Sequence, residues 1–261
     1  MLDFKQITAK DNRLVKLITL LQKSSKARKE NRLFVLEGLR ICLDAAENGV
    51  TFDTLVLSET AYLKFAPDIA VLSDNAKSGV IMSDDLFGRI SDTATPQGVI
   101  ALCGMPETGK PISTNGRYVA LESVADPANI GAIARTAEAL GIDGMIISGD
   151  SCDVYSPKAL RASMGTLLRL PLYFCKDIIS FLNDNSLRGY ACIAQRDADL
   201  KIGEAAFSDG DVVIIGNEAN GLLEETRRGA YKTVTVDMRG KAESLNASAA
   251  AAIVMWELIK R

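Results

Sequence analysis

The stretch DVVIIGNEANGL, residues 211–222, joins an apolar run to a loop rich in glycine and asparagine. The run Val212–Ile215 predicts a fully buried strand, and the loop at the end of such a strand is where an α/β protein binds a ligand with backbone groups. The carboxylate of Glu218 repels phosphate, so this loop favours a cationic or hydroxyl-bearing ligand over a pyrophosphate. An ordinary turn, with Gly and Asn in left-handed conformations, is the simpler alternative.

Two further blocks of this kind are DPANIGAIARTAEALG, residues 126–141, and VDMRGKAESLNASAAAAIVMWEL, residues 236–258. In the block 126–141 we expect Asn129 to cap a helix. We expect Arg135 to reach toward the ligand-binding loops, where an Arg can clamp a phosphate group. A surface salt bridge is the alternative for Arg135. In the other block either Ser244 or Asn246 caps the last helix, which leaves the second polar side chain to hold a small ligand.

Around these blocks, strand-like and helix-like segments alternate in two series, which predicts an α/β protein with a mostly parallel sheet in its second half. The segment 106–116 between the series holds two prolines and two glycines and reads as a linker. We expect helices at 12–30 and 61–65 in the first series, and strands at 33–38 and near Ile69–Leu72.

Composition limits the chemistry. At 261 residues with 48% hydrophobic content, the chain is large enough for one large or two ordinary domains. It contains no histidine, which excludes Ser-His-Asp and Cys-His mechanisms. Its five cysteines form no Cys-x-x-Cys pair, so we expect no metal site. The longest apolar run, 247–256, is too short to span a bilayer, and the beginning of the chain lacks a secretory pattern, so we expect a cytoplasmic protein without a membrane segment.

Charge is distributed unevenly along the chain. The net charge is −3, yet residues 1–40 hold ten Lys and Arg against four Asp and Glu. A basic patch on an acidic protein is typical of a local phosphate contact, and a solvated helix face is the alternative. The densest part of this basic patch comprises Lys23, Lys26, Arg28, Lys29 and Arg32.

Together, the three blocks resemble the signature of the SpoU (TrmH-type) family of RNA ribose 2′-O-methyltransferases, within the SPOUT class. The phrases ISDTATPQGVIAL, residues 90–102, and SPKALRASMGTLLRLPL, residues 156–172, are also similar to this family. The phrase FVLEGLRICLDAAENG, residues 34–49, resembles the family's substrate-binding domain, which is like ribosomal protein L30e. The resemblance therefore covers nearly the whole chain.

The resemblance implies a fold of two α/β domains. Residues 1–105 would form an L30e-like RNA substrate-binding domain, and residues 117–261 a parallel-sheet SPOUT methyltransferase domain with a deep trefoil knot. It further implies S-adenosylmethionine as cofactor, RNA as partner, and a homodimer formed through the catalytic domain.

The resemblance also assigns roles to single residues. Arg135 matches the Arg thought to be catalytic, accompanied by Asn129, Glu218, Ser244 and Asn246. Arg161 joins the basic patch as a candidate RNA contact. The cofactor-binding positions are Gly216, Val236, Met238, Leu245 and Asn246. One departure is Asp237, which stands where the family often has Pro and restores a backbone N–H.

The implied reaction is in-line attack of a ribose 2′-hydroxyl on the methyl group of the cofactor, with Arg135 stabilising the developing negative charge. Relatives with this N-terminal domain favour 23S ribosomal RNA over tRNA as the substrate. A tRNA 2′-O-methyltransferase and a non-catalytic RNA-binding assembly factor on the same fold remain alternatives. A nucleotide-dependent oxidoreductase is disfavoured, because no Gly-x-Gly-x-x-Gly follows the first strand.

Overall fold

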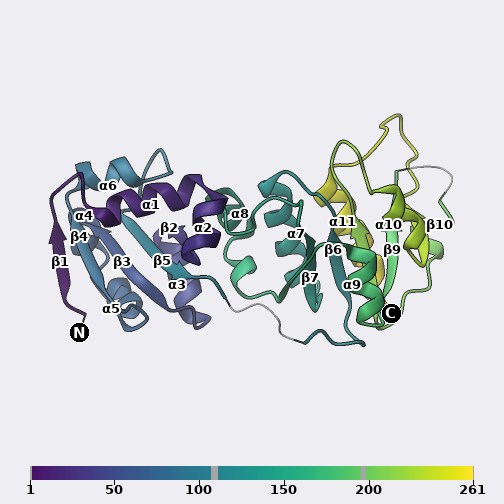
Figure 1. Ribbon diagram of the computed structural model, residues 1–261, viewed down its shortest axis with the longest axis horizontal. Coiled ribbons are helices and arrows are strands. Elements are labelled where there is room, and N and C mark those ends of the chain that lie inside the picture. Colours follow the sequence, from purple (N-terminus) through teal and green to yellow (C-terminus); the bar gives the residue numbers. More distant parts are fainter. Residues whose placement is uncertain (1, 107–110, 195–197, 261) are drawn as a thin grey trace. The chain divides into compact units, whose positions relative to one another are not determined.

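The computed structural model describes residues 2–106, 111–194 and 198–260, which divide into two compact units. Unit 1 comprises the chain up to Pro106 together with Tyr155–Arg169, and unit 2 comprises the rest. The expectation of two α/β domains is confirmed, and Figure 1 labels most of their helices and strands. Residues 107–110 of the expected linker lie outside the described residues.

Unit 1 is built on a five-stranded mixed sheet in the order β1-β4-β3-β5-β2. The β1–β4 and β3–β4 pairs are parallel, and β5 runs antiparallel to both β3 and β2. Its elements are β1 (Phe4–Ile7), α1 (Arg13–Lys23), α2 (Ser25–Asn31), β2 (Leu33–Glu37), α3 (Leu39–Glu47), β3 (Phe52–Ser58), α4 (Glu59–Lys64), α5 (Ala66–Asp74), β4 (Gly79–Met82), α6 (Asp84–Ile90), β5 (Val99–Gly104), α8 (Pro157–Ser163) and the 3₁₀ turn η1 (Thr166–Leu168).

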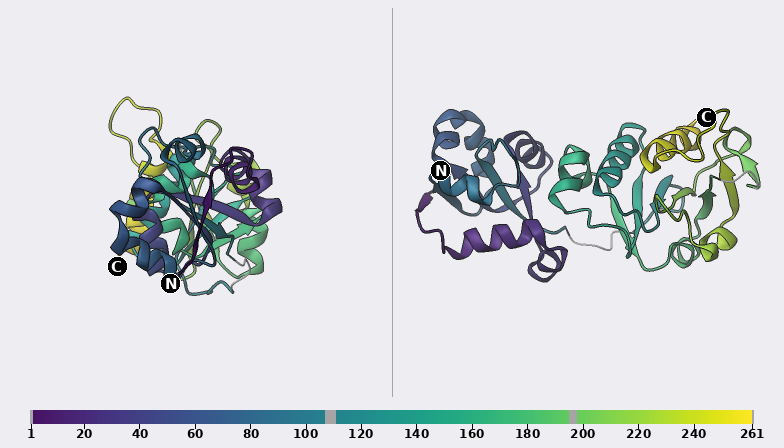
Figure 2. Two further views of the ribbon diagram at one scale, coloured as in Figure 1. Left: turned by 90° about the vertical axis from the view of Figure 1, so that its left-hand side faces the viewer. Right: turned by 90° about the horizontal axis from the view of Figure 1, so that it is seen from above.

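The sheet of unit 1 is covered on both faces. Val15, Ile18 and Leu21 of α1 pack against alternate strand residues, including Val56 and Ile100. Helices α3 and α5 contact each other and lie on the opposite side of the sheet from α1, as the view from above in Figure 2 shows. This arrangement explains why the strands of this unit read as apolar runs rather than as alternating patterns.

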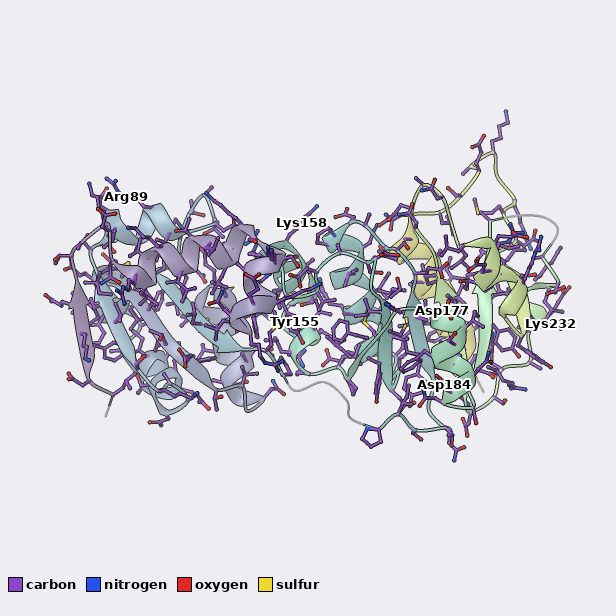
Figure 3. The ribbon with its side chains drawn as sticks, in the orientation of Figure 1. Arg89, Tyr155, Lys158, Asp177, Asp184 and Lys232 are labelled. Carbon is purple, nitrogen blue, oxygen red and sulfur yellow. The ribbon has the colours of Figure 1, made fainter. Side chains whose placement is uncertain are left out.

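Segment 155–169 packs with unit 1, although it follows β7 of unit 2 in the sequence. The ring of Tyr155, labelled in Figure 3, lies with its centroid 5.0 Å from that of Phe34 in β2. Farther along the segment, Arg169 forms an ion pair with Asp44 of α3. The segment therefore covers β2, which lies at an edge of the described sheet.

Unit 2 is built on a seven-stranded sheet in the order β10-β12-β9-β11-β6-β7-β8, and every neighbouring pair is parallel. The parallel sheet predicted for the second half is thus confirmed. Its elements are β6 (Tyr118–Leu121), α7 (Pro127–Ala139), β7 (Gly144–Ser148), β8 (Leu172–Cys175), α9 (Ile178–Asp184), β9 (Arg188–Cys192), β10 (Leu200–Lys201), the 3₁₀ turn η2 (Ile202–Glu204), β11 (Asp211–Ile215), α10 (Glu224–Gly229), β12 (Lys232–Thr235) and α11 (Ala247–Ile259).

The central strands of unit 2 are buried on both faces. Ile178 and Leu182 of α9 pack against one face, whereas α11 packs against α7 and β11. Because the carboxyl ends of parallel strands meet at one edge, the loops that follow β6, β9, β11 and β12 gather there. The chain order also changes direction at this place, since β11 inserts between β6 and β9. In open parallel sheets, that is where ligands bind.

Two expectations about local structure were wrong or incomplete. The strand expected near Ile69–Leu72 is part of helix α5, which begins next to Pro67. Ile69 and Leu72 are buried there three positions apart, which is a helical and not a strand spacing. Strand β1 was not anticipated, because the burial pattern of Phe4–Ile7 is mostly exposed and lacks an apolar run.

Candidate active site

The loop after β11 is closed by its own hydrogen bonds. The backbone N–H groups of Asn217 and Gly221 donate to each other's carbonyl over 3.0 and 2.9 Å. The side-chain oxygen of Asn217 accepts from the N–H groups of Ala219 and Asn220, and its Nδ2 donates to the Ser123 carbonyl. A Cβ atom at Gly216 would overlap the backbone of Gly221, so only glycine fits where the chain leaves the strand.

Glu218 connects this loop to the first turn of α7. Its Oε1 accepts hydrogen bonds from the backbone N–H of Asp126 at 3.1 Å and from Nδ2 of Asn129 at 2.8 Å. Its Oε2 accepts from the backbone N–H of Ala125 at 3.0 Å. The carboxylate therefore accepts hydrogen bonds from N–H groups at the start of a helix, where the helix dipole favours a negative charge.

These hydrogen bonds also set the protonation of Glu218. Its partial burial would by itself raise the pKa of the carboxyl group, because desolvation disfavours the charged form. The hydrogen bonds from Asn129, Ala125 and Asp126 outweigh that effect and lower the pKa below its ordinary value. Glu218 is therefore held as a carboxylate and accepts hydrogen bonds without donating any.

Asn129 links the block 211–222, through Glu218, to the block 236–258, through Asn246. While its Nδ2 donates to Glu218, its Oδ1 accepts from Nδ2 of Asn246 at 3.0 Å. The carboxylate of Glu218 can only accept hydrogen bonds. Asn129 must therefore turn its Nδ2 toward Glu218 and its Oδ1 toward Nδ2 of Asn246, which fixes the orientation of both amides. At the other end, Oδ1 of Asn246 accepts from the backbone N–H groups of Ser248 and Ala249. Three blocks that lie far apart in the sequence are thereby joined into one network.

The caps of the two helices are Asp126 and Asn246. Oδ1 of Asp126 accepts from the N–H of Ala128 at 3.0 Å, and Pro127 occupies the first turn of α7. The expectation that Asn129 caps this helix was therefore wrong, because its side chain is used between Glu218 and Asn246. Asn246, not Ser244, is the cap of α11.

Sequence reasoning missed Glu122, which directly follows β6. Its side chain is buried, and its Oε2 accepts from the backbone N–H of Leu223 at 2.8 Å. Its Oε1 accepts from the hydroxyl of Thr226 in α10. Glu122 thus holds the far end of the loop that Gly216 begins. A glutamate ending the apolar run YVAL was the only signal for it in the sequence.

A cavity of about 490 Å³ opens among these loops. Its lining includes all five positions matched to cofactor binding, as well as Glu218 and Ser244. It does not include Asn129 or Arg135. The lining residues are Cys192, Ile193, Ala194, Ile215, Gly216, Asn217, Glu218, Ala219, Asn220, Gly221, Leu222, Arg227, Val234, Thr235, Val236, Met238, Ser244, Leu245, Asn246, Ala247, Ala250 and Val254.

The cavity fits a cofactor of the size and character of S-adenosylmethionine. Its volume lies within the range of about 300–1,000 Å³ that small-molecule sites occupy. Apolar walls from Ile215, Val234 and Val254 suit a nucleoside, and Gly216 lets a ligand approach the backbone closely. Burial raises the pKa of the Cys192 thiol to about 12, so this cavity residue offers no thiolate nucleophile near neutral pH.

Arg135 lies apart from the network just described. It is exposed on α7, and no hydrogen bond or ion pair joins it to the described part of the chain. It follows Asn129 by six residues, which corresponds to about 9 Å along the helix and about 240° around it. Its side chain therefore leaves α7 on a different face from that of Asn129, where it is exposed and open to an external anion.

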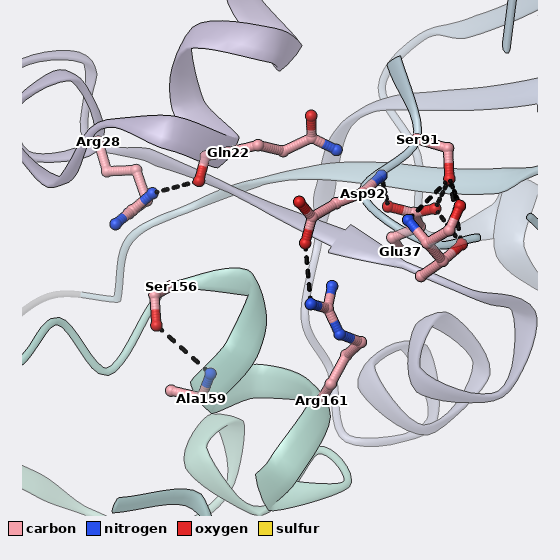
Figure 4. A network of polar contacts seen from close by, with 9 residues as sticks. Gln22, Arg28, Glu37, Ser91, Asp92, Ser156, Ala159 and Arg161 are labelled. Carbon is pink, nitrogen blue, oxygen red and sulfur yellow. Dashed lines mark hydrogen bonds and ion pairs between the residues drawn. The ribbon is translucent and has the colours of Figure 1, made fainter. Parts of the chain in front are cut away.

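The basic patch divides into exposed and buried side chains. Lys23, Lys26, Lys29 and Arg32 are exposed. Arg28 is only 4% exposed, and its guanidinium group donates to the carbonyls of Leu21 and Gln22 at the end of α1 (Figure 4). The expectation that Arg28 contacts RNA is corrected accordingly, because its side chain holds the junction of α1 and α2.

Arg161 is also engaged within the chain. Its Nη2 lies 2.8 Å from Oδ2 of Asp92, in the loop that follows α6 (Figure 4). The same loop is held by Glu37, which accepts from the hydroxyls of Ser91 and Thr93 and from the Asp92 backbone N–H. The structure thus places Arg161 in the packing of segment 155–169 against unit 1.

Residues 2–106, 111–194 and 198–260 contain neither a cluster of metal ligands nor a helix that could span a membrane. No group of three or more His, Cys, Asp or Glu side chains in these ranges is arranged to hold a metal ion. None of the helices described there combines the length and the apolar character needed to cross a bilayer.

Both halves of the chain match known protein families. Residues 116–256 match the SpoU rRNA Methylase family, and residues 12–101 match the MRM3-like substrate binding domain. The chain is 29% identical over 265 residues to the 23S rRNA (guanosine(2553)-2′-O)-methyltransferase RlmP of Bacillus subtilis. That alignment covers 97% of this chain and 99% of the relative.

Two solved structures resemble the whole chain. An AdoMet-bound rRNA methyltransferase from Sinorhizobium meliloti superimposes with a TM-score of 0.85 at 28% identity, covering 98% of this chain and 97% of the other. The SpoU methyltransferase AviRb from Streptomyces viridochromogenes, in complex with AdoMet, gives a TM-score of 0.86 at 26% identity. Here the coverage is 95% of this chain and 97% of the other.

Proposed function

Because the chain belongs to the SpoU rRNA Methylase family, we propose that it transfers a methyl group from S-adenosylmethionine to a ribose 2′-oxygen of 23S ribosomal RNA. The observation that carries this proposal is the hydrogen-bonded chain Glu218–Asn129–Asn246. It fixes the loops around one cavity of suitable size, and the similar chains from Sinorhizobium meliloti and Streptomyces viridochromogenes bind AdoMet.

The cofactor would be held by Gly216, Val236, Met238, Leu245 and Asn246. When bound, it supplies a methyl group on a positively charged sulfur, so the protein has to position and activate the sugar. Glu218, Asn129 and Asn246 keep the loops in register. Ser244 lies in the cavity wall and can hydrogen-bond a polar group of a ligand.

Arg135 is the residue proposed to activate the ribose hydroxyl. A guanidinium group stays protonated and cannot act as a base, so its contribution is electrostatic. It stabilises the negative charge that develops on the 2′-oxygen, or it holds the neighbouring phosphate in place. Its exposure and its lack of partners in the described chain support this role.

The RNA would be bound mainly by unit 1. Lys23, Lys26, Lys29 and Arg32 provide exposed positive charge on or beside α1 and α2. This assignment agrees with the match of residues 12–101 to a substrate-binding domain. We propose the division into residues 1–105 for RNA binding, 106–116 as linker and 117–261 for catalysis.

The remaining features of the proposal concern assembly. We propose a cytoplasmic homodimer that forms through the catalytic domain, and a trefoil knot in the chain around the cavity. Ile253 and Trp256 of α11 are exposed apolar side chains and support a dimer surface on this helix. The knot is what membership of the SpoU family implies, and the ribosomal substrate of the relative RlmP supports the location.

The experiment that tests the function is methyl transfer from radiolabelled S-adenosylmethionine to purified RNA. We expect label in 23S ribosomal RNA and none in 16S ribosomal RNA or tRNA, and mapping 2′-O-methyl sites in a deletion strain should then show one missing site. Label in tRNA alone would replace the proposed substrate. Cofactor binding without any transfer would favour the assembly-factor alternative.

A further inference from the structure

We propose that Arg227 binds the carboxylate of the amino-acid end of S-adenosylmethionine, an inference that rests on the proposed function of the cavity. Arg227 is the one cationic side chain among the described residues that line this cavity. No feature of the three sequence blocks pointed to it, because it lies beyond the loop that they define. Its role follows from its position, its surroundings and the chemistry of the ligand.

The backbone of Arg227 is held firmly at the cavity. It lies in α10, and its N–H donates to the carbonyl of Leu223 at 3.0 Å. Leu223 and Thr226, the residue before Arg227, are both hydrogen-bonded to the buried carboxylate of Glu122. The carboxylate that closes the loop after β11 therefore also positions Arg227. Such anchoring through a buried group limits the freedom of the helix that presents the guanidinium.

The charges described around the cavity favour an anion beside Arg227. Glu218 is the one carboxylate in the described lining, and it already accepts three N–H groups. Glu224 lies 3.7 Å from Nη1 of Arg227, yet it is largely exposed and lies closer, at 2.8 Å, to Nε of Arg228. Exposed ion pairs of this kind are weak. Because a guanidinium has five donors, Arg227 can also bind a carboxylate from the cavity side.

The ligand needs such a group. S-adenosylmethionine combines an adenosine with an amino-acid end that carries a carboxylate. The apolar wall of Ile215, Val234, Val236 and Leu245 suits the nucleoside but offers nothing to a negative charge. The Arg227 side chain is 27% exposed, so a carboxylate there would be partly shielded from water. Arginine is the side chain best matched to a carboxylate, which it binds with two parallel hydrogen bonds.

The test compares two ligands by calorimetry on the full-length chain. S-adenosylhomocysteine contains the carboxylate, and its decarboxylated analogue lacks only that group. We expect Arg227→Met to weaken binding of S-adenosylhomocysteine by about 10- to 100-fold and to leave the analogue unchanged. Arg228→Met is the matched control, because Arg228 is the exposed neighbour on the same helix and does not line the cavity. It should affect neither ligand.

The outcomes separate this inference from the proposed function. If Arg227→Met weakens both ligands equally, or neither, Arg227 does not bind the carboxylate. Weaker RNA binding at unchanged S-adenosylhomocysteine affinity would assign the side chain to RNA phosphate and would overturn the inference too. If the unaltered protein binds neither ligand, it is the cofactor assignment that fails. Arg227→Gln provides a second variant should the Met variant unfold, and the same ligand difference decides it.

Discussion

Asn129 donates its side-chain N–H to Glu218 over 2.8 Å and so joins the start of α7 to the loop that follows β11. The other side of the same amide accepts from Asn246, the cap of α11. One asparagine therefore connects two helix starts and one strand end. This linkage suggests that the cavity forms as a unit, and its residues can be tested separately.

Asn246 allows the cap and the link to be separated. Asn246→Asp keeps an acceptor for the first turn of α11 but places a carboxylate oxygen against Oδ1 of Asn129. We expect this variant to keep the helix yet lose about 1–3 kcal/mol of unfolding free energy, because a buried acceptor loses its donor. In an Asn129→Ala background the same Asn246→Asp change should cost much less, and urea unfolding of the unaltered protein, the two single variants and the double variant measures this coupling.

Gly216 should tolerate no side chain. In Gly216→Ala the added methyl group would overlap the backbone of Gly221, so the loop has to shift and the cavity wall moves with it. We expect at least a tenfold loss of S-adenosylhomocysteine affinity by calorimetry. Gly203→Ala is the control, since nothing lies within 4 Å of its added Cβ. Equal affinity in both variants would show that the loop is more adaptable than the structure indicates.

Arg135 should affect transfer without affecting cofactor binding. Because it is exposed and does not line the cavity, Arg135→Ala should bind S-adenosylhomocysteine normally. We expect its rate of methyl transfer to fall by about 10²–10³-fold, as for other groups that stabilise developing charge. Single-turnover assays with saturating RNA measure this rate. Normal transfer by the variant would remove Arg135 from the mechanism.

The basic patch should show two different responses. Lys26→Glu and Lys29→Glu change exposed charges, so we expect weaker RNA binding and a shallower salt dependence. Stability should fall by no more than about 0.5 kcal/mol, since Lys26 loses only an exposed ion pair with Glu30. Arg28→Ala should instead lower the melting temperature, because the carbonyls of Leu21 and Gln22 lose their donor. Filter binding at several salt concentrations and thermal unfolding measure the two effects. RNA affinity that is unchanged by both lysine substitutions would argue against the patch as an RNA contact.

Stability should depend on pH through Glu218. The pKa of its carboxyl group is lower in the folded chain than in the unfolded one, where it is about 4.3. Its contribution is therefore complete above that value and is lost as the pH falls through the lower, folded pKa. We expect the stability difference between the unaltered protein and Glu218→Gln to be constant near neutral pH and to shrink in this acidic range. Denaturant unfolding at a series of pH values would reveal the trend, and a difference that grows with acidity would contradict it.

Much of this architecture could be predicted locally. The apolar run Val212–Ile215 identified β11, because strands of a parallel sheet are buried on both faces. The helix expected at 12–30 is divided into α1 and α2, which meet at Ser24. The apolar residues Leu14, Leu17, Ile18 and Leu21 repeat with a helical period only within α1. Ile69 and Leu72 misled the prediction, because a short apolar stretch does not distinguish a strand from a helix turn.

The sequence by itself determined the kinds of element, the three Gly- and Asn-rich blocks and the absence of histidine chemistry, since each depends on residues adjacent in the chain. Tertiary structure alone decided the partners of the polar side chains. Asn129 and Arg28 illustrate this: both looked available in sequence, and both are occupied by groups that only folding brings near. A hydrogen bond depends on the distance and direction between two atoms, and for residues about 90 positions apart the packing of the sheet fixes both.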